Sequence, residues 1–201
     1  MRRFILQYLS MLFDMENTQD FDPYDILASL VVPRPIAWVS TIGPEGTPNL
    51  APFSFYNAVC DDPPLIMLSI SKREDGRRKD TARNILYIGE FVVNLVSEEL
   101  LKEVVITSES FPSEVSEFER AGLETADCHK IKAPRVARAK AWLECKLLKH
   151  EELFGYDLFF GRILLVGAES LDIEELRPVG RIHGSFCKIL ELNQGFYKLM
   201  E

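Results

Sequence analysis

Runs of apolar residues, alternating or continuous, divide the chain into segments that mostly predict β-strands. The run ILASLVVPRPIAWVST (26–41) is rich in β-branched residues and predicts a strand that enters through a proline-rich bend. GPEG (43–46) separates it from a second strand-like run, NLAPFSFYNA (49–58), so the two runs predict a hairpin. Pro52 has no amide hydrogen to donate, which favours a sheet edge or a bulge for the return strand.

The middle of the chain predicts helices set among further strands. PLIMLSIS (64–71) is continuously apolar and predicts a strand buried on both faces. Asp80 or Thr81 can begin a helix that Gly89 ends, and FVVNLV (91–96) is strand-like again.

A helical insertion is expected at about residues 98–122. A short helical pattern follows Ser97, and a second one has Ser113 as its expected cap and Gly122 as its end. Both patterns are brief, so the insertion is expected to add short helices to a β-rich fold.

The last third of the chain is strand-like. AWLECKLLKH (141–150) alternates, and YDLFFGRILLVGAES (156–170) is a long strand whose Gly161 favours a bulge or a close approach. RPVGRIHGSFCKILEL (177–192) predicts a turn and a final strand. The chain has about six or seven predicted strands with many apolar positions, so both faces of their sheet must be covered. This predicts a closed or partly closed antiparallel barrel, in a mainly β fold with inserted helices.

Length and charge narrow the class of protein. The 201 residues suit one domain, 22–201, after an N-terminal arm or extension of residues 1–21. A net charge of −8 argues against binding to nucleic acid. MRRFILQYLSMLF (1–13) lacks a signal-peptide cleavage site, is interrupted by polar residues and is too short to span a bilayer. We therefore expect a cytoplasmic protein with no membrane association.

The sequence lacks the common catalytic motifs. Its four cysteines are widely scattered and have no histidine at ligand spacing, so neither a zinc site nor a disulfide framework is expected. GxSxG, HExxH, P-loop and GxGxxG patterns are all missing. No catalytic side chain is predicted, and a bound cofactor would have to carry any chemistry.

Two clusters could hold such a cofactor. Polar and aromatic residues interleave along the first hairpin, which suits a planar ring with polar edges; alternatively, the aromatic residues are core and the hydroxyls cap strand ends. The segment SISKREDGRRKDTARN (69–84) places hydroxyls and cations just before a helix start, which suits one phosphate group. The alternative for this segment is a solvated basic loop.

Four segments follow one another in the chain: RPIAWVST…G…NLAPFSFYN, PPLIMLSIS, RKDTARNI and FVVNLVSEEL. In this order and spacing they resemble the flavin reductase-like family with the FMN-binding split-barrel fold. The resemblance extends from about Asp22 to Tyr197. It implies a Greek-key type antiparallel barrel, a homodimer and an FMN molecule at or near the subunit interface. It also implies three groups of FMN-binding residues. These are Arg34, Pro35, Ile36, Ala37, Trp38, Val39, Ser40 and Thr41 along the ring; Asn49, Ala51, Pro52, Phe53, Ser54, Phe55 and Asn57 on the adjacent wall; and Ser69, Ser71, Arg78, Lys79, Asp80 and Thr81 at the phosphate and ribityl chain.

The chain departs from the family pattern near its end. Members often carry R-x-G-G-x-x-Y, whereas this chain has His183 and Cys187 in place of a glycine and an aromatic residue. From the residues alone, His183 could be a proton donor or simply a surface polar group. The departure is expected to change the outer pocket, and with it the electron donor or acceptor.

The activity implied by the resemblance is hydride transfer from NADH or NADPH to FMN. Electrons would then pass to free flavin, a partner monooxygenase, a metal complex or oxygen. Hydride transfer requires no side-chain acid or base, which agrees with the missing motifs. Two alternatives stay open: an FMN-binding electron carrier or storage protein without NAD(P)H activity of its own, and a structural barrel without a ligand.

Overall fold

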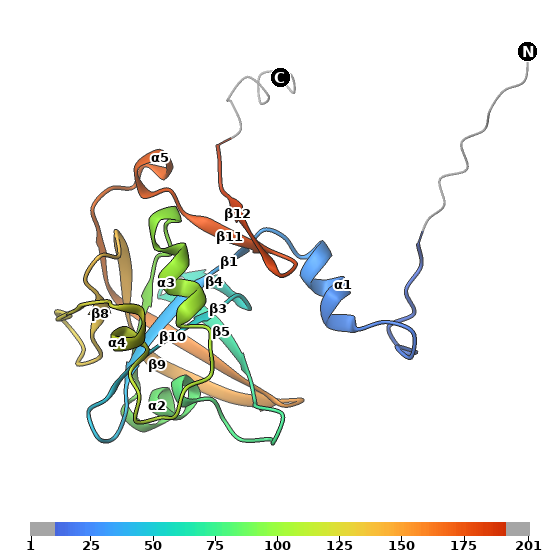
Figure 1. Ribbon diagram of the computed structural model, residues 1–201, viewed down its shortest axis with the longest axis horizontal. Coiled ribbons are helices and arrows are strands. Elements are labelled where there is room, and N and C mark those ends of the chain that lie inside the picture. Colours follow the sequence, from blue (N-terminus) through green and yellow to red (C-terminus); the bar gives the residue numbers. More distant parts are fainter. Residues whose placement is uncertain (1–10, 192–201) are drawn as a thin grey trace, which may run out of the picture.

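The computed structural model describes residues 11–191 and forms a split β-barrel (Figure 1). The first ten residues of the expected N-terminal arm, and the end of the expected last strand, lie outside this range. Seven antiparallel strands make the main sheet, in the order β3-β2-β6-β9-β10-β5-β4. Their bounds are β2 (Ala37–Ile42), β3 (Pro48–Phe53), β4 (Tyr56–Asp61), β5 (Pro64–Ser71), β6 (Glu90–Asn94), β9 (Ala141–Leu153) and β10 (Tyr156–Ala168).

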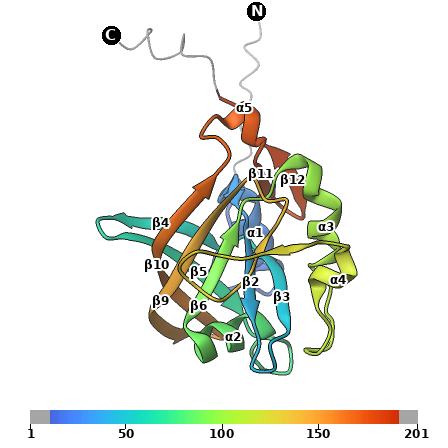
Figure 2. The ribbon, with the colours of Figure 1, turned by 90° about the vertical axis from the view of Figure 1, so that its left-hand side faces the viewer.

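Smaller elements close the two ends of the barrel. The helix α2 covers one end, and a three-stranded sheet of order β1-β11-β12 lies at the other (Figures 1 and 2). The remaining elements are α1 (Pro23–Leu30), β1 (Arg34–Pro35), α2 (Asp80–Ile88), the 3-10 helix η1 (Glu98–Leu100), α3 (Leu101–Ile106), α4 (Glu117–Ala121), β7 (Thr125–Ala126), β8 (Arg135–Val136), α5 (Ile173–Leu176), β11 (Val179–Ile182) and β12 (Ser185–Lys188).

Strand β2 separates two hydrophobic clusters. Trp38 packs outward against α3 and α4, in a cluster that includes Leu100 and Phe118. Val39 points the other way, into the barrel interior with Phe91 and other buried residues. Both faces of β2 are therefore covered, and the strand is a central support of the fold.

The predicted first hairpin is confirmed. β2 pairs with β3 around a turn in which Gly46 has a positive φ of 84°, a conformation that glycine adopts without steric cost. Pro52 lies opposite Trp38, and β3 is an end strand of the sheet, as the missing amide hydrogen predicted. The chain then bends at Ser54 and Phe55 before β4 begins.

The structure corrects three expectations about strands. Residues 26–30 are not strand but the end of α1, because the Asp22 side chain accepts a hydrogen bond from the Tyr24 amide and Pro23 occupies the first turn. β5 is fully buried on one face only, since its odd-numbered residues are half-buried. The described part of the segment after residue 177 forms a two-stranded hairpin, β11–β12, instead of a single strand.

The predicted helices are present, with one corrected start. α2 ends at Gly89 in the left-handed region, as expected. α4 begins only at Glu117, so Ser113 does not cap it. The hydroxyl of Ser116 donates instead to the Pro48 carbonyl at 2.8 Å, and the Glu117 carboxylate accepts from the Leu50 amide at 3.0 Å. These two bonds fix α4 against the edge strand β3.

The long β9–β10 ribbon contains the bulge predicted at Gly161, where the pairing shifts by one residue. A Cβ atom at this position would lie 2.4 Å from Cζ of the buried Phe91. We expect Gly161→Ala to lower the free energy of unfolding by about 1–3 kcal/mol because of overpacking. Urea denaturation measures the effect, with Gly43→Ala as the control, since a Cβ there meets nothing closer than 3.5 Å. Equal stability of the two variants would contradict the prediction.

Candidate functional site

A groove follows the outer side of β3, between the start of α2 and the segment that joins α3 to α4. It consists of two adjoining cavities, which share Pro52, Phe53, Lys79 and Ser108 in their walls. The inner cavity, of about 110 Å³, also contains Asn49 and Thr81. The outer cavity, of about 590 Å³, reaches the β11–β12 hairpin.

The inner cavity is built around the first turn of α2. Lys79 precedes the helix and its side chain makes no capping hydrogen bond. The Thr81 hydroxyl accepts a bond of 2.9 Å from the Asn49 side-chain amide, which ties α2 to β3. Amide groups at a helix start attract anions, and here a lysine and a threonine lie beside them.

Lys79 is the unusual charge in this cavity. Its ammonium group lies 5.8 Å from the centre of the Phe53 ring, and within residues 11–191 it has no ion-pair partner. Burial lowers the pKa of the Lys79 amine, and the nearby Arg73 lowers it further. An anion placed here would compensate the lysine charge.

Three carboxylates border the same cavity, those of Asp80, Glu109 and Glu117. Asp80 forms ion pairs with Arg73, at 2.6 Å, and with Arg83. Glu117 is buried, and burial raises the pKa of its carboxyl group, although the hydrogen bond from the Leu50 amide opposes that effect. The carboxylate of Asp80 is thus held by arginines, while Lys79 stays available.

The outer cavity has a mixed wall, in which apolar and aromatic side chains lie beside hydroxyl and cationic groups. Phe53 and Pro52 come from β3, and Phe186 comes from β12. The Arg181 guanidinium lies over the Phe186 ring, 4.8 Å from its centre. Tyr24 of α1 and the Ser54 side chain also line this cavity. Such walls suit a planar ring with polar edges.

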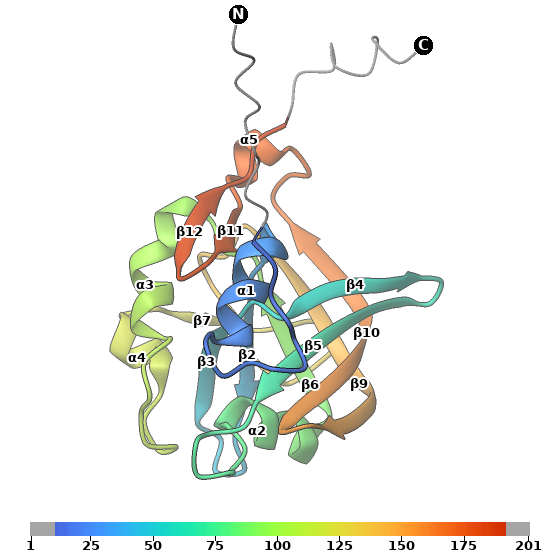
Figure 3. The same ribbon diagram turned by 90° about the vertical axis from the view of Figure 1, so that its right-hand side faces the viewer.

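Arg34 connects three segments next to the outer cavity through hydrogen bonds. Its buried guanidinium donates to the carbonyl oxygens of Ala28 (2.6 Å) and His183 (3.1 Å) and to the Ser54 hydroxyl (3.3 Å). The His183 amide donates back to Ala28, and its ring contacts the Ser29 hydroxyl. Figure 3 shows the resulting neighbourhood of α1 and the β11–β12 hairpin. His183 therefore binds the hairpin to α1, at the rim of the groove.

The structure brings together only part of the residue set predicted to bind FMN. Those that line the two cavities share the β3 wall and the α2 start: Ile36, Asn49, Ala51, Pro52, Phe53, Ser54, Lys79, Asp80 and Thr81.

A second group lies elsewhere. Phe55, Asn57 and Ser69, with Arg34 and Pro35, border a separate apolar cavity of about 400 Å³ near α1.

Strand β2 does not contribute side chains to the groove. The predicted residues Ala37, Trp38, Val39, Ser40 and Thr41 are each 0% exposed. The Trp38 indole N–H donates to the Thr107 hydroxyl at 2.9 Å, and Thr41 accepts from Asn84. The geometry does not support ring contacts by these five side chains, because core residues already surround them.

Two predicted phosphate residues also lie away from the inner cavity. Arg78 is paired with Asp157 at 2.9 Å and with Glu152 at 2.7 Å. Ser71 lies at the end of β5 and borders neither cavity of the groove.

Several groove residues were missed by sequence reasoning. They come from α1, from α3 and the segment after it, and from the final hairpin: Tyr24, Val104, Val105, Thr107, Ser108, Glu109, Ser110, Phe111, Arg181, Gly184 and Phe186. The family pattern around residues 181–187 pointed to the outer pocket, but the segments from α1 and α3 show no local motif, so only the fold places them in the groove.

Other kinds of site receive no support from the described residues. Within residues 11–191, no group of three or more His, Cys, Asp or Glu side chains could hold a metal ion. The four cysteines are free thiols. None of the helices in this part of the chain is long and apolar enough to cross a membrane.

Comparison with known proteins gives a family match over most of the chain. Residues 29–189 match the model of the flavin reductase like domain. An uncharacterized protein of Aquifex aeolicus is 45% identical over 182 residues, covering 87% of this chain and 93% of its own length.

Solved structures share the fold. Nitrilotriacetate monooxygenase component B from Bacillus cereus is 31% identical, with a TM-score of 0.85 over 92% of this chain and 98% of its own. A protein with a split barrel domain from Shewanella frigidimarina, assigned to the flavin reductases, is 22% identical, with a TM-score of 0.81 over 92% and 98% of the two chains. The split-barrel fold predicted from the sequence is therefore confirmed.

Proposed function

Because the chain belongs to the flavin reductase-like family of oxidoreductases, we propose that it binds FMN in the groove along β3 and reduces it with NADH or NADPH. The observation that carries the proposal is the half-buried Lys79 at the start of α2, which has no ion-pair partner among residues 11–191. It lies in a cavity that continues directly into a larger one with aromatic walls.

The donors of the inner cavity fit a phosphate monoester. Lys79 supplies a charge, Thr81 a hydroxyl, and the uncapped first turn of α2 supplies amide groups. Asp80 would repel a dianion, but its charge is shared with Arg73 and Arg83. Glu109 and Glu117 also border the cavity, so it is the local group of donors at Lys79, and not the net charge of the wall, that favours an anion.

The outer cavity fits the flavin ring. Phe53, Pro52 and Phe186 offer apolar faces, whereas Ser54 and Arg181 offer a hydroxyl and a guanidinium to polar ring edges. The volume of about 590 Å³ leaves space for a second planar group beside the first.

When bound, FMN would supply the redox chemistry by accepting a hydride from the nicotinamide and passing electrons on. The protein's own residues would hold the phosphate at Lys79 and Thr81, and would orient the two rings between β3 and β12. Orientation of two reactants contributes up to about 7–11 kcal/mol in favourable cases. No side-chain acid or base is assigned.

We also propose a homodimer, as the family resemblance implies. The β4–β5 hairpin projects from the barrel (Figures 2 and 3), and the outer edge of β4 is unpaired within the described residues. Exposed apolar side chains lie on β4 and α1, among them Val59, Leu27 and Leu30. Light scattering after size exclusion would report a mass twice the 23.0 kDa of the chain; a monomeric mass would refute the dimer.

The electron acceptor is proposed to be free flavin or a partner monooxygenase. The similarity to a monooxygenase component from Bacillus cereus supports a partner protein. The cytoplasmic location stays a prediction.

A second function is an FMN-binding electron carrier without NAD(P)H activity. It is favoured by His183, the residue that departs from the family pattern, which directly precedes Gly184 in the wall of the outer cavity. An absorbance spectrum of the purified protein after FMN addition and desalting tests flavin binding. A stopped-flow mixture with NADH or NADPH then separates the functions. Bleaching of the bound flavin within seconds excludes the carrier, and the absence of bleaching with both nucleotides excludes the reductase.

FMN affinity is expected to fall as the pH rises from 8 to 10. Phosphate stays a dianion in this range because its second pKa is about 6, whereas Lys79 loses its proton below the ordinary lysine pKa. Asp80, Glu109 and Glu117 are the carboxyl groups that border the cavity. Fluorescence titration across this range measures the change. In Lys79→Arg the slope should vanish, since arginine stays charged; an identical slope in this variant would contradict the prediction.

A further inference from the structure

A buried carboxylate lies on the ribbon formed by β9 and β10, and the proposed function does not use it. Asp157 belongs to β10, and its side chain is 1% exposed. It lies opposite Ile70 of β5 on one side and Glu152 of β9 on the other. Burial of an ionised carboxylate is costly unless cationic or hydrogen-bonding groups surround it. The partners of Asp157 therefore decide what this residue can do.

Arg78 is the main partner of this carboxylate. Its Nε atom donates to both oxygens of Asp157, at 2.9 and 3.2 Å, and its Nη2 atom donates to Glu152 at 2.7 Å. The Nε2 atom of His150 lies 2.7 Å from the same carboxylate of Asp157. Arg78 is thus held by two carboxylates of the β9–β10 ribbon, and the bond to Asp157 is shielded from water because that residue is buried.

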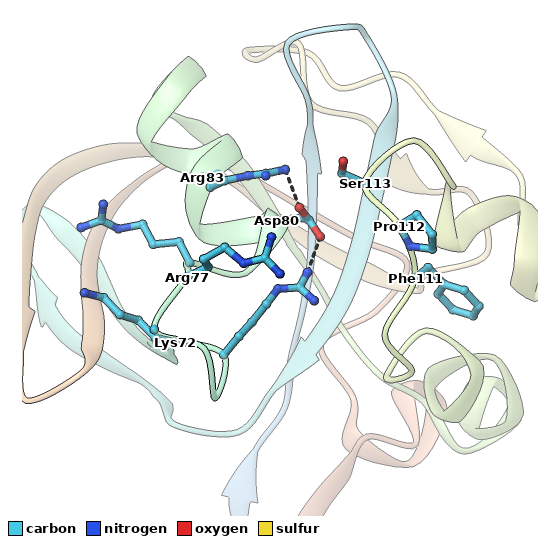
Figure 4. Close-up of a pocket in the computed structure, with 10 residues that line it drawn as sticks. Lys72, Arg77, Asp80, Arg83, Phe111, Pro112 and Ser113 are labelled. Atoms are coloured by element: carbon cyan, nitrogen blue, oxygen red, sulfur yellow. Dashed lines mark hydrogen bonds and ion pairs between the residues drawn. The ribbon is translucent and has the colours of Figure 1, made fainter.

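The same ribbon also holds the start of the loop between β5 and α2. The Lys72 amide donates to the Gly155 carbonyl at 2.9 Å, and the Lys72 ammonium pairs with Glu152. Figure 4 shows this loop, from Lys72 at its start to Asp80, where α2 begins. The loop of residues 72–79 is therefore attached to the ribbon near both of its ends.

Lys79 follows Arg78 directly but extends to a different element. Its ammonium group lies 5.8 Å from the centre of the Phe53 ring on β3, and its side chain makes no capping hydrogen bond to α2. Two residues later, the Thr81 hydroxyl accepts the bond from Asn49. Lys79 thus lies between two anchored residues, Arg78 and Thr81, and its position in the inner cavity depends on both.

We propose that Asp157 is a positioning residue for the anion site: through its bonds to Arg78 it fixes the chain just before α2, so that Lys79 extends into the inner cavity. This inference rests on the proposed function, in which the anion at Lys79 is the FMN phosphate. In this role Arg78 contributes to binding without touching the anion, since both of its ion-pair partners lie on the ribbon. Removal of the Asp157 charge releases Arg78, and Lys79 then loses one of its two anchors.

A double-mutant cycle on the full chain tests this coupling. Asp157→Asn is expected to weaken FMN binding about tenfold in the wild-type background and less than about twofold in the Lys79→Ala background, because nothing is left to position once the lysine is gone. Fluorescence titration of FMN gives the dissociation constants of the wild type and the three variants.

Glu144→Gln is the matched control. Glu144 is another fully buried carboxylate of the ribbon; it accepts bonds from the amides of His129 and Lys130 and borders neither cavity of the groove. Its replacement costs stability without touching the loop before α2, so FMN affinity should stay within about twofold of the wild type.

A second readout needs no flavin. Lysine amines are labelled by reductive methylation, and the Lys79 signal, assigned with Lys79→Arg, is followed by NMR during a pH titration. In the wild type, burial and the nearby Arg73 lower the pKa of the Lys79 amine. In Asp157→Asn we expect this pKa to rise toward the ordinary lysine value as the side chain moves into water. Loss of the carboxylate charge alone would lower the pKa, so a rise reports movement of Lys79.

Equal or tighter FMN binding in Asp157→Asn would overturn the proposal. A loss of affinity that persists in full in the Lys79→Ala background would overturn it too, because the substitution would then act without the lysine. Arg78→Gln breaks the same pair from the other side and must reproduce the loss and its dependence on Lys79; it decides the question if Asp157→Asn does not fold. A wild-type chain that binds no FMN refutes the proposed function, whereas an unchanged Lys79 pKa in the flavin-free titration of Asp157→Asn refutes the positioning role.

Discussion

Replacing Lys79 by Ala together with Thr81 by Val is expected to weaken FMN binding roughly 100-fold, because a charge-assisted hydrogen bond contributes about 1.5–3 kcal/mol and a neutral one about 1 kcal/mol. Lys79 is the half-buried cation of the inner cavity, and Thr81 lies in the first turn of α2 in the same wall. Fluorescence titration of FMN gives the dissociation constants.

Two further variants make this result specific. Lys149→Ala removes an exposed lysine that is paired with Glu151, and should leave FMN affinity unchanged. Lys79→Arg retains the charge and should recover most of the binding. An unchanged dissociation constant in the Lys79/Thr81 double variant would remove the phosphate assignment and, with it, the main support for the proposed function.

Trp38→Ala is expected to lower the free energy of unfolding by about 3–5 kcal/mol. The Trp38 side chain is 0% exposed and packs in the cluster between β2 and the helices α3 and α4. Its loss would leave a large cavity and remove the hydrogen bond that the Thr107 hydroxyl accepts from the indole N–H. Urea denaturation measures the change; a loss below about 1 kcal/mol would be inconsistent with a core position.

Trp38→Phe separates a core role from a ring-binding role. This milder variant keeps most of the packing and should destabilise the chain by about 1–2 kcal/mol through the lost bond to Thr107. FMN affinity should stay within about twofold of the wild type, since no Trp38 surface reaches the groove. A large loss of affinity would restore Trp38 to the ring wall that the family resemblance implies.

The sequence predicts the barrel well because hydrophobic periodicity and turn residues act locally. Pro52 indicates an edge strand, Gly89 and Gly122 indicate helix ends, and Gly161 indicates a bulge; all four are confirmed. The failure at residues 26–30 has a local cause too: the capping residue Asp22 precedes Pro23, and this helix start outweighs the β-branched residues that follow.

The candidate site is harder to predict from the sequence than the barrel. Period-two alternation assigns Trp38 and Ser40 to one face of a strand, but it does not reveal that both faces of β2 are covered. Glu144 shows the same limit. A charged residue in a strand is expected to face water, yet this carboxylate is fully buried and accepts bonds from the amides of His129 and Lys130. Only tertiary contacts decide such positions.

Because Arg34 contacts both α1 and the β11–β12 hairpin, the groove forms only after the hairpin has been synthesised. Arg34 joins α1, near one end of the sequence, to the carbonyl of His183, near the other. During synthesis, a nascent chain that does not yet contain β11 and β12 lacks Arg181 and Phe186, and with them one side of the outer cavity. Whatever occupies this groove will distinguish finished chains from prematurely terminated ones, so ligand retention doubles as a measure of full-length synthesis.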